Sequence, residues 1–259
     1  MCLVLVVWRA HPRYACVVAA NRDEFHARPT APAGWWQDHP RILAGRDLEA
    51  QGTWLGMTRG GRFAALTNYR GPQQRRDAST PSRGTLVTTM LESGATVAQG
   101  LDYLAEVGSR FNGFNLIFSD GERLGIYESV RGQGRELGPG LYGLSNDLLD
   151  TPWPKVLNAK GRLQAAFGDM TDTAALLDVL RDEESAPCTQ LPKTGVSLER
   201  ELLLSSAFVR AQDYGTRCST IIRMEPKGLA YFEEWSWNSD GAESGRVSLQ
   251  FGLEKSVSH

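Results

Sequence analysis

Two short apolar segments open the chain, at residues 2–8 and 14–20, and five residues that include Pro12 separate them. Proline suits a turn and is excluded from the middle of a central strand. Within each segment the apolar residues follow one another directly, a pattern typical of strands that are covered on both faces. The pattern predicts a buried β-hairpin in the middle of a layered structure.

The segment after this hairpin is rich in turn-forming residues. Residues 28–40 hold several prolines and tryptophans, and we expect an ordered loop there because proline disfavours regular elements. Residues 52–70 predict a second hairpin that turns at Gly60 and Gly61. Residues 71–84 are charged and turn-forming with almost no apolar content, which predicts a surface loop with solvated arginines.

Helical periodicity begins at Thr85 and continues to about Val107, and Ser93 with Gly94 divides this stretch into two helices. Later helices are expected at residues 154–166, 173–181 and 197–204. Further strands are expected at residues 114–130, with a turn at Asp120 and Gly121, and at 141–146, 216–224 and 228–237. The last dozen residues are expected either to add an edge strand or to fray.

Strands followed by helices and then by strands, with hairpin connections, predict an α+β layered fold rather than alternating βαβ units. No glycine-rich phosphate-binding motif is present, so a nucleotide-binding fold has no support. We find no internal repeat and no change of composition that marks a boundary. The expectation is one domain over residues 1–259.

Composition and charge narrow the class of protein. The 259 residues are 41% apolar and 22% charged, with a formal net charge of −2, as in an ordinary globular protein. The near balance of charges argues against nucleic acid as a partner, and the short apolar runs argue against stable membrane insertion. No positively charged leader precedes the first apolar run, so we expect a cytoplasmic protein.

The four cysteines are Cys2, Cys16, Cys188 and Cys218, and their spacing fits neither a zinc site nor a disulfide framework. Cys2 differs from the others in its position. Removal of Met1 leaves a cysteine that carries both a thiol and a free α-amine, and such an amine serves as the base for an amino-terminal nucleophile. The alternative is a chain that merely begins with cysteine.

Four polar residues follow the second apolar strand, namely Asn21, Arg22, Asp23 and Glu24. In a regular hairpin they return to the level of Cys2. Arg22 is then expected beside the thiol, where it favours the thiolate, with Asp23 or Glu24 orienting Arg22 or the α-ammonium group. A polar exit loop with an internal salt bridge has about equal weight.

Asn68 and Asn146 both stand where an apolar strand ends, and an Asn amide there can donate to an oxyanion. Either residue taken alone is more typical of a turn. Asn21, Trp54, Tyr69 and Arg217 are the candidates for substrate binding, with Arg217 as a second cation. Trp54, with Trp35 and Trp36, either caps the core or lines an amphipathic pocket. The histidines form neither a catalytic triad nor a metal motif, so no metal is expected.

Several separated blocks of sequence, among them residues 1–8, 19–36, 44–70, 143–146 and 152–156, resemble the NRDE family, also called the transport-and-Golgi-organisation family. The family is similar to N-terminal-nucleophile (Ntn) hydrolases of the cysteine amidase kind. The resemblance implies a four-layer αββα sandwich of two stacked antiparallel sheets. It also implies Cys2 as nucleophile, Arg22 with Asp23 or Glu24 as its support, and Asn68 and Asn146 near the oxyanion.

Two functions follow from this resemblance. The first is hydrolysis of a linear amide C–N bond in a small amphipathic substrate through Cys2, with no cofactor required. The second is a non-catalytic carrier in haem trafficking that binds haem, a lipid or acyl-coenzyme A in the same cleft. A bound haem takes an axial ligand such as His11, His26 or Cys2, or lies in an apolar slot. The sequence indicates no oligomeric state.

Overall fold

The computed structural model describes residues 2–72 and 77–254. Its α-helices are α1 (Gly84–Glu92), α2 (Val97–Val107), α3 (Pro154–Ala165), α4 (Thr173–Leu180) and α5 (Leu198–Leu203), with short 3-10 turns at Gly108–Arg110, Phe167–Asp169 and Cys188–Gln190. Its strands are β1 (Cys2–Trp8), β2 (Cys16–Phe25), β3 (Thr30–Trp35), β4 (Ile42–Asp47), β5 (Leu55–Thr58), β6 (Phe63–Asn68), β7 (Phe114–Ser119), β8 (Leu124–Glu128), β9 (Gln133–Leu137), β10 (Gly140–Leu144), β11 (Tyr214–Met224), β12 (Leu229–Trp237) and β13 (Glu243–Gly252). None of the described helices has the length and the apolar run that crossing a bilayer requires.

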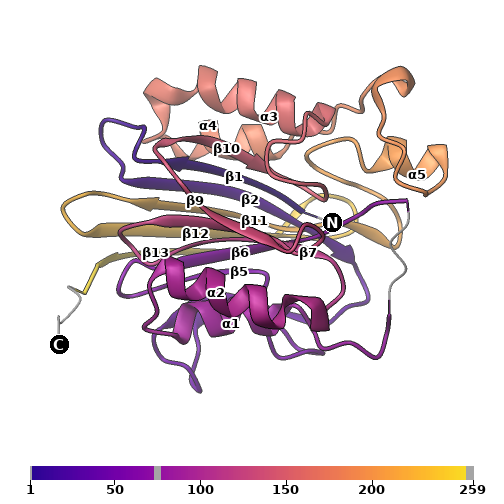
Figure 1. Cartoon of the computed structure of the whole chain (residues 1–259). Coiled ribbons are helices and arrows are strands. Elements are labelled where there is room, and N and C mark those ends of the chain that lie inside the picture. The colour runs from indigo at the N-terminus through magenta and orange to yellow at the C-terminus, as the bar shows by residue number, and fades with distance from the viewer. Residues whose placement is uncertain (1, 73–76, 255–259) are drawn as a thin grey trace.

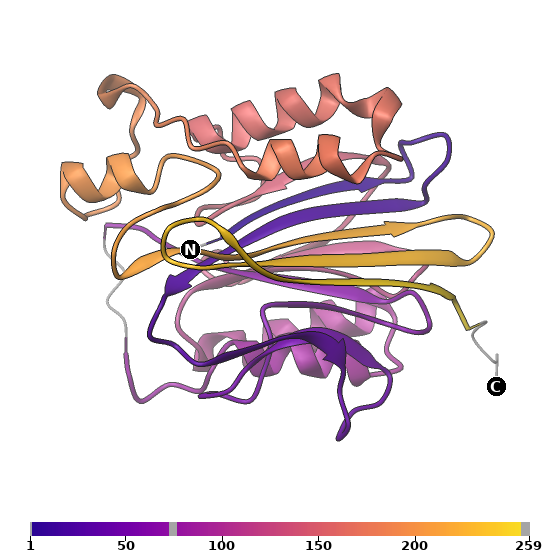
Figure 2. The ribbon, with the colours of Figure 1, turned by 180° about the vertical axis from the view of Figure 1, so that it is seen from behind.

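The strands form two antiparallel sheets stacked face to face, with helices on both outer faces (Figures 1 and 2). The first sheet has the order β10-β1-β2-β11-β12-β13, and the second has the order β3-β4-β5-β6-β7-β8-β9. Helices α3 and α4 pack on the first sheet, and α1 and α2 pack on the second. The predicted α+β fold, a four-layer αββα sandwich, is confirmed.

The apolar character of β1 and β2 follows from these layers. Val4 and Val6 point into the core between the two sheets, whereas Leu3 and Leu5 point into the core beneath α3 and α4. Successive side chains of a strand face opposite ways, so a strand covered on both faces needs apolar residues at every position. The predicted central hairpin is confirmed, and this alternation fixes where the polar end of β2 can point.

The expected loop at residues 28–40 is wrong in part, because Thr30–Trp35 form strand β3. This strand lies at the edge of the second sheet, and its register shifts between Ala31 and Gly34. Pro32 falls within the irregular stretch, where a missing N–H costs no ladder hydrogen bond. The sequence pattern also gave no sign of β4 or β9.

Strand β2 runs to Phe25, so Asn21 to Glu24 belong to the strand rather than to an exit loop. Helices α1 and α2 break where Ser93 and Gly94 predict. The hairpin turns at Gly60–Gly61 and after Asp120 are confirmed, the second extending to Arg123 rather than spanning two residues. Strand β13 bears out the edge-strand alternative for the C-terminal part.

Part of the expected surface loop at 71–84, residues 73–76, lies outside the described residues. The rest of this segment is not uniformly solvated. The Arg83 guanidinium donates to the carbonyl oxygen of Gly113 at 3.0 Å, and Asn112 holds Asp77 through its amide. The segment at 77–84 is therefore tied to the end of the second sheet.

Glu234 is a buried carboxyl group that joins the two sheets. It is 2% exposed on β12, and its oxygens accept hydrogen bonds from the backbone N–H of Ala33 on β3 at 2.7 Å and from the Thr220 hydroxyl at 3.1 Å. Burial raises the pKa of Glu234 to about 7, although these hydrogen bonds and the Arg22 charge act to lower it.

We expect Glu234→Gln to stabilise the protein at pH 8 by about 3 kcal/mol, the equivalent of the shift in pKa. Because the pKa of Glu234 is higher in the folded chain, the folded chain binds the proton more tightly than the unfolded chain. The stabilisation from this proton is complete below the pKa of the unfolded chain and is lost as pH rises through about 7. Urea unfolding at pH 5 and pH 8 measures the change. The exposed Glu122→Gln is the control, and equal pH dependence in all three proteins would contradict the expectation.

Candidate functional site

The N-terminal end of β1 and the C-terminal end of β2 meet at one edge of the sandwich. In the antiparallel register Cys2 lies opposite Arg22, which in turn lies opposite Cys218 of β11. Directly paired residues share a face of the sheet, and this row faces the second sheet. A cavity of about 460 Å³ opens here, lined by Cys2, Arg22, Asp23, Glu24, Arg28, Asp47, Glu49, Trp54, Leu66, Asn68, Asp77, Arg83 and Tyr214 among others.

Cys2 lies on the wall of this cavity and is 9% exposed. Its carbonyl oxygen accepts a hydrogen bond from the Ser145 hydroxyl at 3.0 Å, and its sulfur receives one from the backbone N–H of Asp23. Burial raises the pKa of the Cys2 thiol, and the Asp23 charge adds to this, whereas Arg22 acts to lower it. Arg22 favours the thiolate as predicted, but burial is the larger effect and acts against it.

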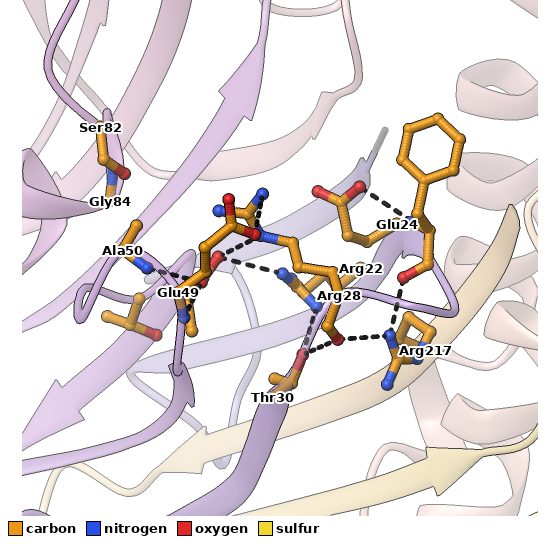
Figure 3. Close-up of polar contacts among 12 residues, drawn as sticks. Arg22, Glu24, Arg28, Thr30, Glu49, Ala50, Ser82, Gly84 and Arg217 are labelled. Carbon is orange, nitrogen blue, oxygen red and sulfur yellow. Dashed lines mark hydrogen bonds and ion pairs between the residues drawn. The ribbon is translucent and has the colours of Figure 1, made fainter.

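The Arg22 guanidinium is buried and held on several sides. It stacks on the Trp54 ring at 4.4 Å and donates to the Thr30 hydroxyl at 3.2 Å. Its other amino group lies 3.5 Å from a carboxylate oxygen of Asp47. Figure 3 shows Arg22 and Arg28 converging between Thr30 and the loop that carries Glu49. These contacts fix the cation on the cavity wall.

The acid paired with Arg22 is Asp47, which was not predicted. The other predicted role of Asp23 or Glu24, orienting the α-ammonium group, stays a prediction. Asp23 follows Arg22 directly in a strand, so its side chain points to the opposite face. Glu24 shares the face of Arg22, but its carboxylate accepts from the backbone N–H of Phe25 at 2.8 Å. Asp47 also receives the Arg28 guanidinium at 2.6 Å. Although burial opposes it, this bond helps hold the pKa of Asp47 below its usual value.

Asp23 also lines the cavity, next to Arg22 in β2. Its carboxylate accepts from the Thr216 hydroxyl at 2.7 Å, and the Tyr214 hydroxyl donates to its carbonyl oxygen at 2.9 Å. Asp23 is 2% exposed, and burial raises its pKa. It lies next to Cys2 in the lining and can accept a hydrogen bond from an amine there.

The two predicted oxyanion residues have different places. Asn68 lines the cavity at the end of β6. Asn146 is fully buried and donates its amide to the carbonyl oxygen of Asn68 at 2.7 Å. The pair is brought together as predicted, but Asn146 lies outside the lining and anchors the Asn68 backbone.

Of the predicted binding residues, only Trp54 lines the cavity. Asn21 lies on the α4 side of the sheet, where its amide donates to the carbonyl oxygens of Leu180 and Ala207. Arg217 donates to the carbonyl oxygens of Phe25, His26 and Arg28 at the end of β2 and in the connection to β3. Figure 3 shows Arg217 beside Arg28. Tyr69 lies beyond Asn68, with its backbone bound to Gly113. These three residues shape the surroundings of the site.

Several charged residues of the site were not predicted from the sequence, namely Arg28, Asp47, Glu49, Asp77 and Arg83 of the lining and Lys155 behind it. Asp47 is far from Arg22 in sequence, and only the pairing of β3 with β4 brings them together. Lys155 lies in the first turn of α3 and is 3% exposed. A lysine within an apolar helical face was its one visible signal.

The predicted haem ligands are separated from each other. His11 lies beyond the far end of β1 from Cys2, where one ring nitrogen faces the carbonyl oxygen of Phe167 at 3.0 Å and the other accepts from backbone N–H groups. His26 follows β2 and lies outside the cavity lining. Within the described ranges, no three His, Cys, Asp or Glu side chains are grouped to hold a metal ion.

The fold is similar to that of solved Ntn hydrolases. A mutant of the conjugated bile acid hydrolase from Clostridium perfringens aligns with a TM-score of 0.52 and 9% identity, covering 100% of this chain and 99% of that one. A second variant of the same hydrolase aligns with a TM-score of 0.51 and 9% identity over 99% of both chains. At this identity the likeness concerns the fold alone.

The sequence relatives are much nearer. The human Transport and Golgi organization protein 2 homolog is 39% identical, covering 91% of this chain and 93% of its own, and the Drosophila melanogaster protein is 26% identical over 90% and 91%. The family model described as Transport and Golgi organisation 2 matches residues 1–239. The chain therefore belongs to the Transport and Golgi organisation 2 family, the NRDE family that its sequence resembles.

Proposed function

We propose that this protein hydrolyses a linear amide bond of a small molecule through Cys2, after Met1 has been removed. The observation that carries the proposal is the placement of the Cys2 thiol on the wall of a polar cavity, directly opposite a fixed Arg22. Because burial raises the pKa of the Cys2 thiol, the reaction needs a base that takes the thiol proton at the moment of attack. The α-amine of the same residue is that base.

The proposed reaction has two stages. The α-amine takes the thiol proton while sulfur bonds to the amide carbon, and the Asn68 amide donates to the resulting oxyanion. The C–N bond then breaks, and the leaving nitrogen takes the proton from the α-ammonium. Water attacks the thioester with the same amine as base, and the carboxylic acid departs as sulfur regains its proton. Asp23 holds the amine in place.

The cavity chemistry limits the substrate class. A volume of about 460 Å³ suits a small molecule. In the lining, Leu66 is buried and Trp54 is half-buried, whereas the charged Glu49 and Asp77 are exposed. An amphipathic amide with its acyl part inward and a polar group outward matches this division. The four cysteines are free, in keeping with the cytoplasmic location that we propose.

Haem or lipid carriage remains a separate hypothesis. No histidine is among the residues that line the described cavity, and its walls carry several carboxylates. These features favour a polar substrate over a large flat porphyrin. A haem titration followed by Soret absorbance separates the two hypotheses, because saturable binding abolished by Cys2→Ala would place haem in the same cavity.

The experiment for the hydrolase is to trap the acyl-enzyme. We expect p-nitrophenyl acetate to add one acetyl group to the Cys2 thiol in a chain whose first residue is Cys2. Peptide mass spectrometry after acid quenching detects it, and its loss in neutral hydroxylamine distinguishes a thioester from acetylation of the α-amine. Cys188, which is exposed, reports the unassisted reactivity of a thiol in the same sample. A chain that retains Met1 in every molecule, or acetylation of Cys2 no faster than that of Cys188, contradicts the proposal.

A further inference from the structure

Behind the Cys2 cavity, on the face of the first sheet that α3 covers, lies a second polar cluster. It contains two acids and two bases from four separate elements: Asp23 of β2, Arg70 after β6, Lys155 of α3 and Glu201 of α5. Asp23, Lys155 and Glu201 are each at most 3% exposed. Buried charges are costly unless they are balanced, so the pairing within this cluster decides its state.

One acid and one base of the cluster pair directly. The Arg70 guanidinium lies 3.1 Å from a carboxylate oxygen of Glu201, whose other oxygen accepts from the backbone N–H of Thr194 at 2.8 Å. This pair is self-contained. The charge that remains is one carboxylate, Asp23, and one ammonium, Lys155, so the cluster is neutral when both are ionised.

Lys155 is held in an unfavourable place for a cation. It lies in the first turn of α3, where the helix dipole presents positive charge, and the turn has no acidic residue. No described residue accepts a hydrogen bond from its Nζ atom. The ammonium group therefore acts on its surroundings through its charge rather than through a hydrogen bond. Its burial costs stability, so we look for a role of this charge at the Cys2 site.

We propose that Lys155 is a positioning residue of the Cys2 site, whose charge offsets Asp23 and keeps the α-amine of Cys2 unprotonated. This inference rests on the proposed function and adds a residue to it. Without Lys155 the negative charge of Asp23 is no longer offset by that lysine, which favours the ammonium form of the amine. A neighbouring cation favours the free amine, as in other enzymes that need an unprotonated amine at neutral pH.

The charged and titratable groups around Lys155 are consistent with this role. Burial lowers the pKa of Lys155, and the positive charge of Arg70 lowers it further. The charge of Asp23 acts most strongly to raise this pKa, and Cys2 and Glu201 act in the same direction. Tyr214 of β11 faces Asp23 as a neutral phenol, because burial raises its pKa well above the usual value. Asp23 is thus the acid whose charge acts most strongly on Lys155.

The test measures the protonation of the amine directly. The full mature chain is released from a fusion by cleavage just before residue 2, in a Cys2→Ala background, because a thiol beside the amine would itself take up the label. Competitive acetylation by acetic anhydride is followed by peptide mass spectrometry between about pH 5 and pH 10. We expect Lys155→Met to move the midpoint up by about one pH unit, so that labelling at a pH below both midpoints falls about tenfold.

Two matched variants give the controls. Lys155→Arg keeps the charge and is expected to keep the midpoint. Lys160→Met removes the lysine one turn further along α3, whose Nζ lies 2.6 Å from Asp150 and which is partly exposed, and it too is expected to leave the midpoint unchanged. If Lys155 had only a structural role, Lys155→Met would lower the stability of the fold without moving the pH midpoint of amine labelling.

An unchanged midpoint in folded Lys155→Met overturns the inference, as does an equal shift in Lys160→Met. If Lys155→Met fails to fold, Asp23→Asn replaces it in the test. This variant leaves the charge of Lys155 without the opposing charge of Asp23, so the midpoint of amine labelling must move down. An unchanged midpoint in Asp23→Asn overturns the inference. This measurement contains no Cys2 thiol. An unchanged midpoint therefore leaves the acyl-enzyme result standing, and failure to acylate Cys2 leaves standing the measured effect of Lys155 on the protonation of the amine.

Discussion

Replacing Cys2 with alanine is expected to lower kcat/KM for N-acyl p-nitroanilides by about 10⁴-fold or more, the scale of losing a nucleophile. The Cys2 side chain is small and lies on the cavity wall, and alanine removes only its sulfur and the hydrogen bond from the Asp23 backbone N–H, so we expect the fold to be retained. The loss appears in kcat rather than KM, because the bond to sulfur forms only along the reaction path.

A cysteine outside the cavity gives the matched control. Cys188→Ala alters an exposed thiol in a short 3-10 turn and is expected to leave turnover unchanged. Cys2→Ser retains a nucleophile of higher pKa and should fall between the two. Residual turnover in Cys2→Ala within tenfold of the unmodified chain would remove the catalytic role of the thiol, whatever the outcome at Cys188.

The layered fold was predictable because its strands and helices obey simple periodicities. The uniformly apolar β1 and β2 required cover on both faces, and Ser93 and Gly94 placed the break between α1 and α2. Strand β3 escaped because a proline normally argues against a strand, and only an edge position with a shifted register accommodates it. Edge strands carry a weaker pattern than central ones.

The site was predictable only where chain neighbours stay neighbours in space. The hairpin placed Arg22 opposite Cys2, as expected from its length. The support from Asp47 depends on the pairing of β3 with β4, and the approach of Lys155 depends on how α3 packs, neither of which leaves a local pattern. Alternation along β2 then assigns Arg22 to the cavity face and Asn21 to the helix face, a distinction that the polar run hides.

Asn21 is thereby a residue of the fold, and its replacement tests this reading. Its amide donates to the carbonyl oxygens of Leu180 at 2.7 Å and Ala207 at 2.8 Å, and its oxygen accepts from the Ser219 hydroxyl at 2.6 Å. The residue is 1% exposed. Asn21→Ala leaves these buried groups without hydrogen-bond partners, and water does not reach them to replace the amide. Each unpaired group lowers the free energy of unfolding by about 1–3 kcal/mol.

We expect Asn21→Ala to lower the free energy of unfolding by about 4 kcal/mol, because part of the lost bonding is recovered as α4 and the segment around Ala207 relax. Urea unfolding at pH 7 measures the change. Asn158→Ala on the exposed face of α3 is the control and should alter stability by less than about 0.5 kcal/mol. An Asn21→Ala chain of unchanged stability with a raised KM would instead make Asn21 a substrate-binding residue, because only contact with the substrate then accounts for its effect.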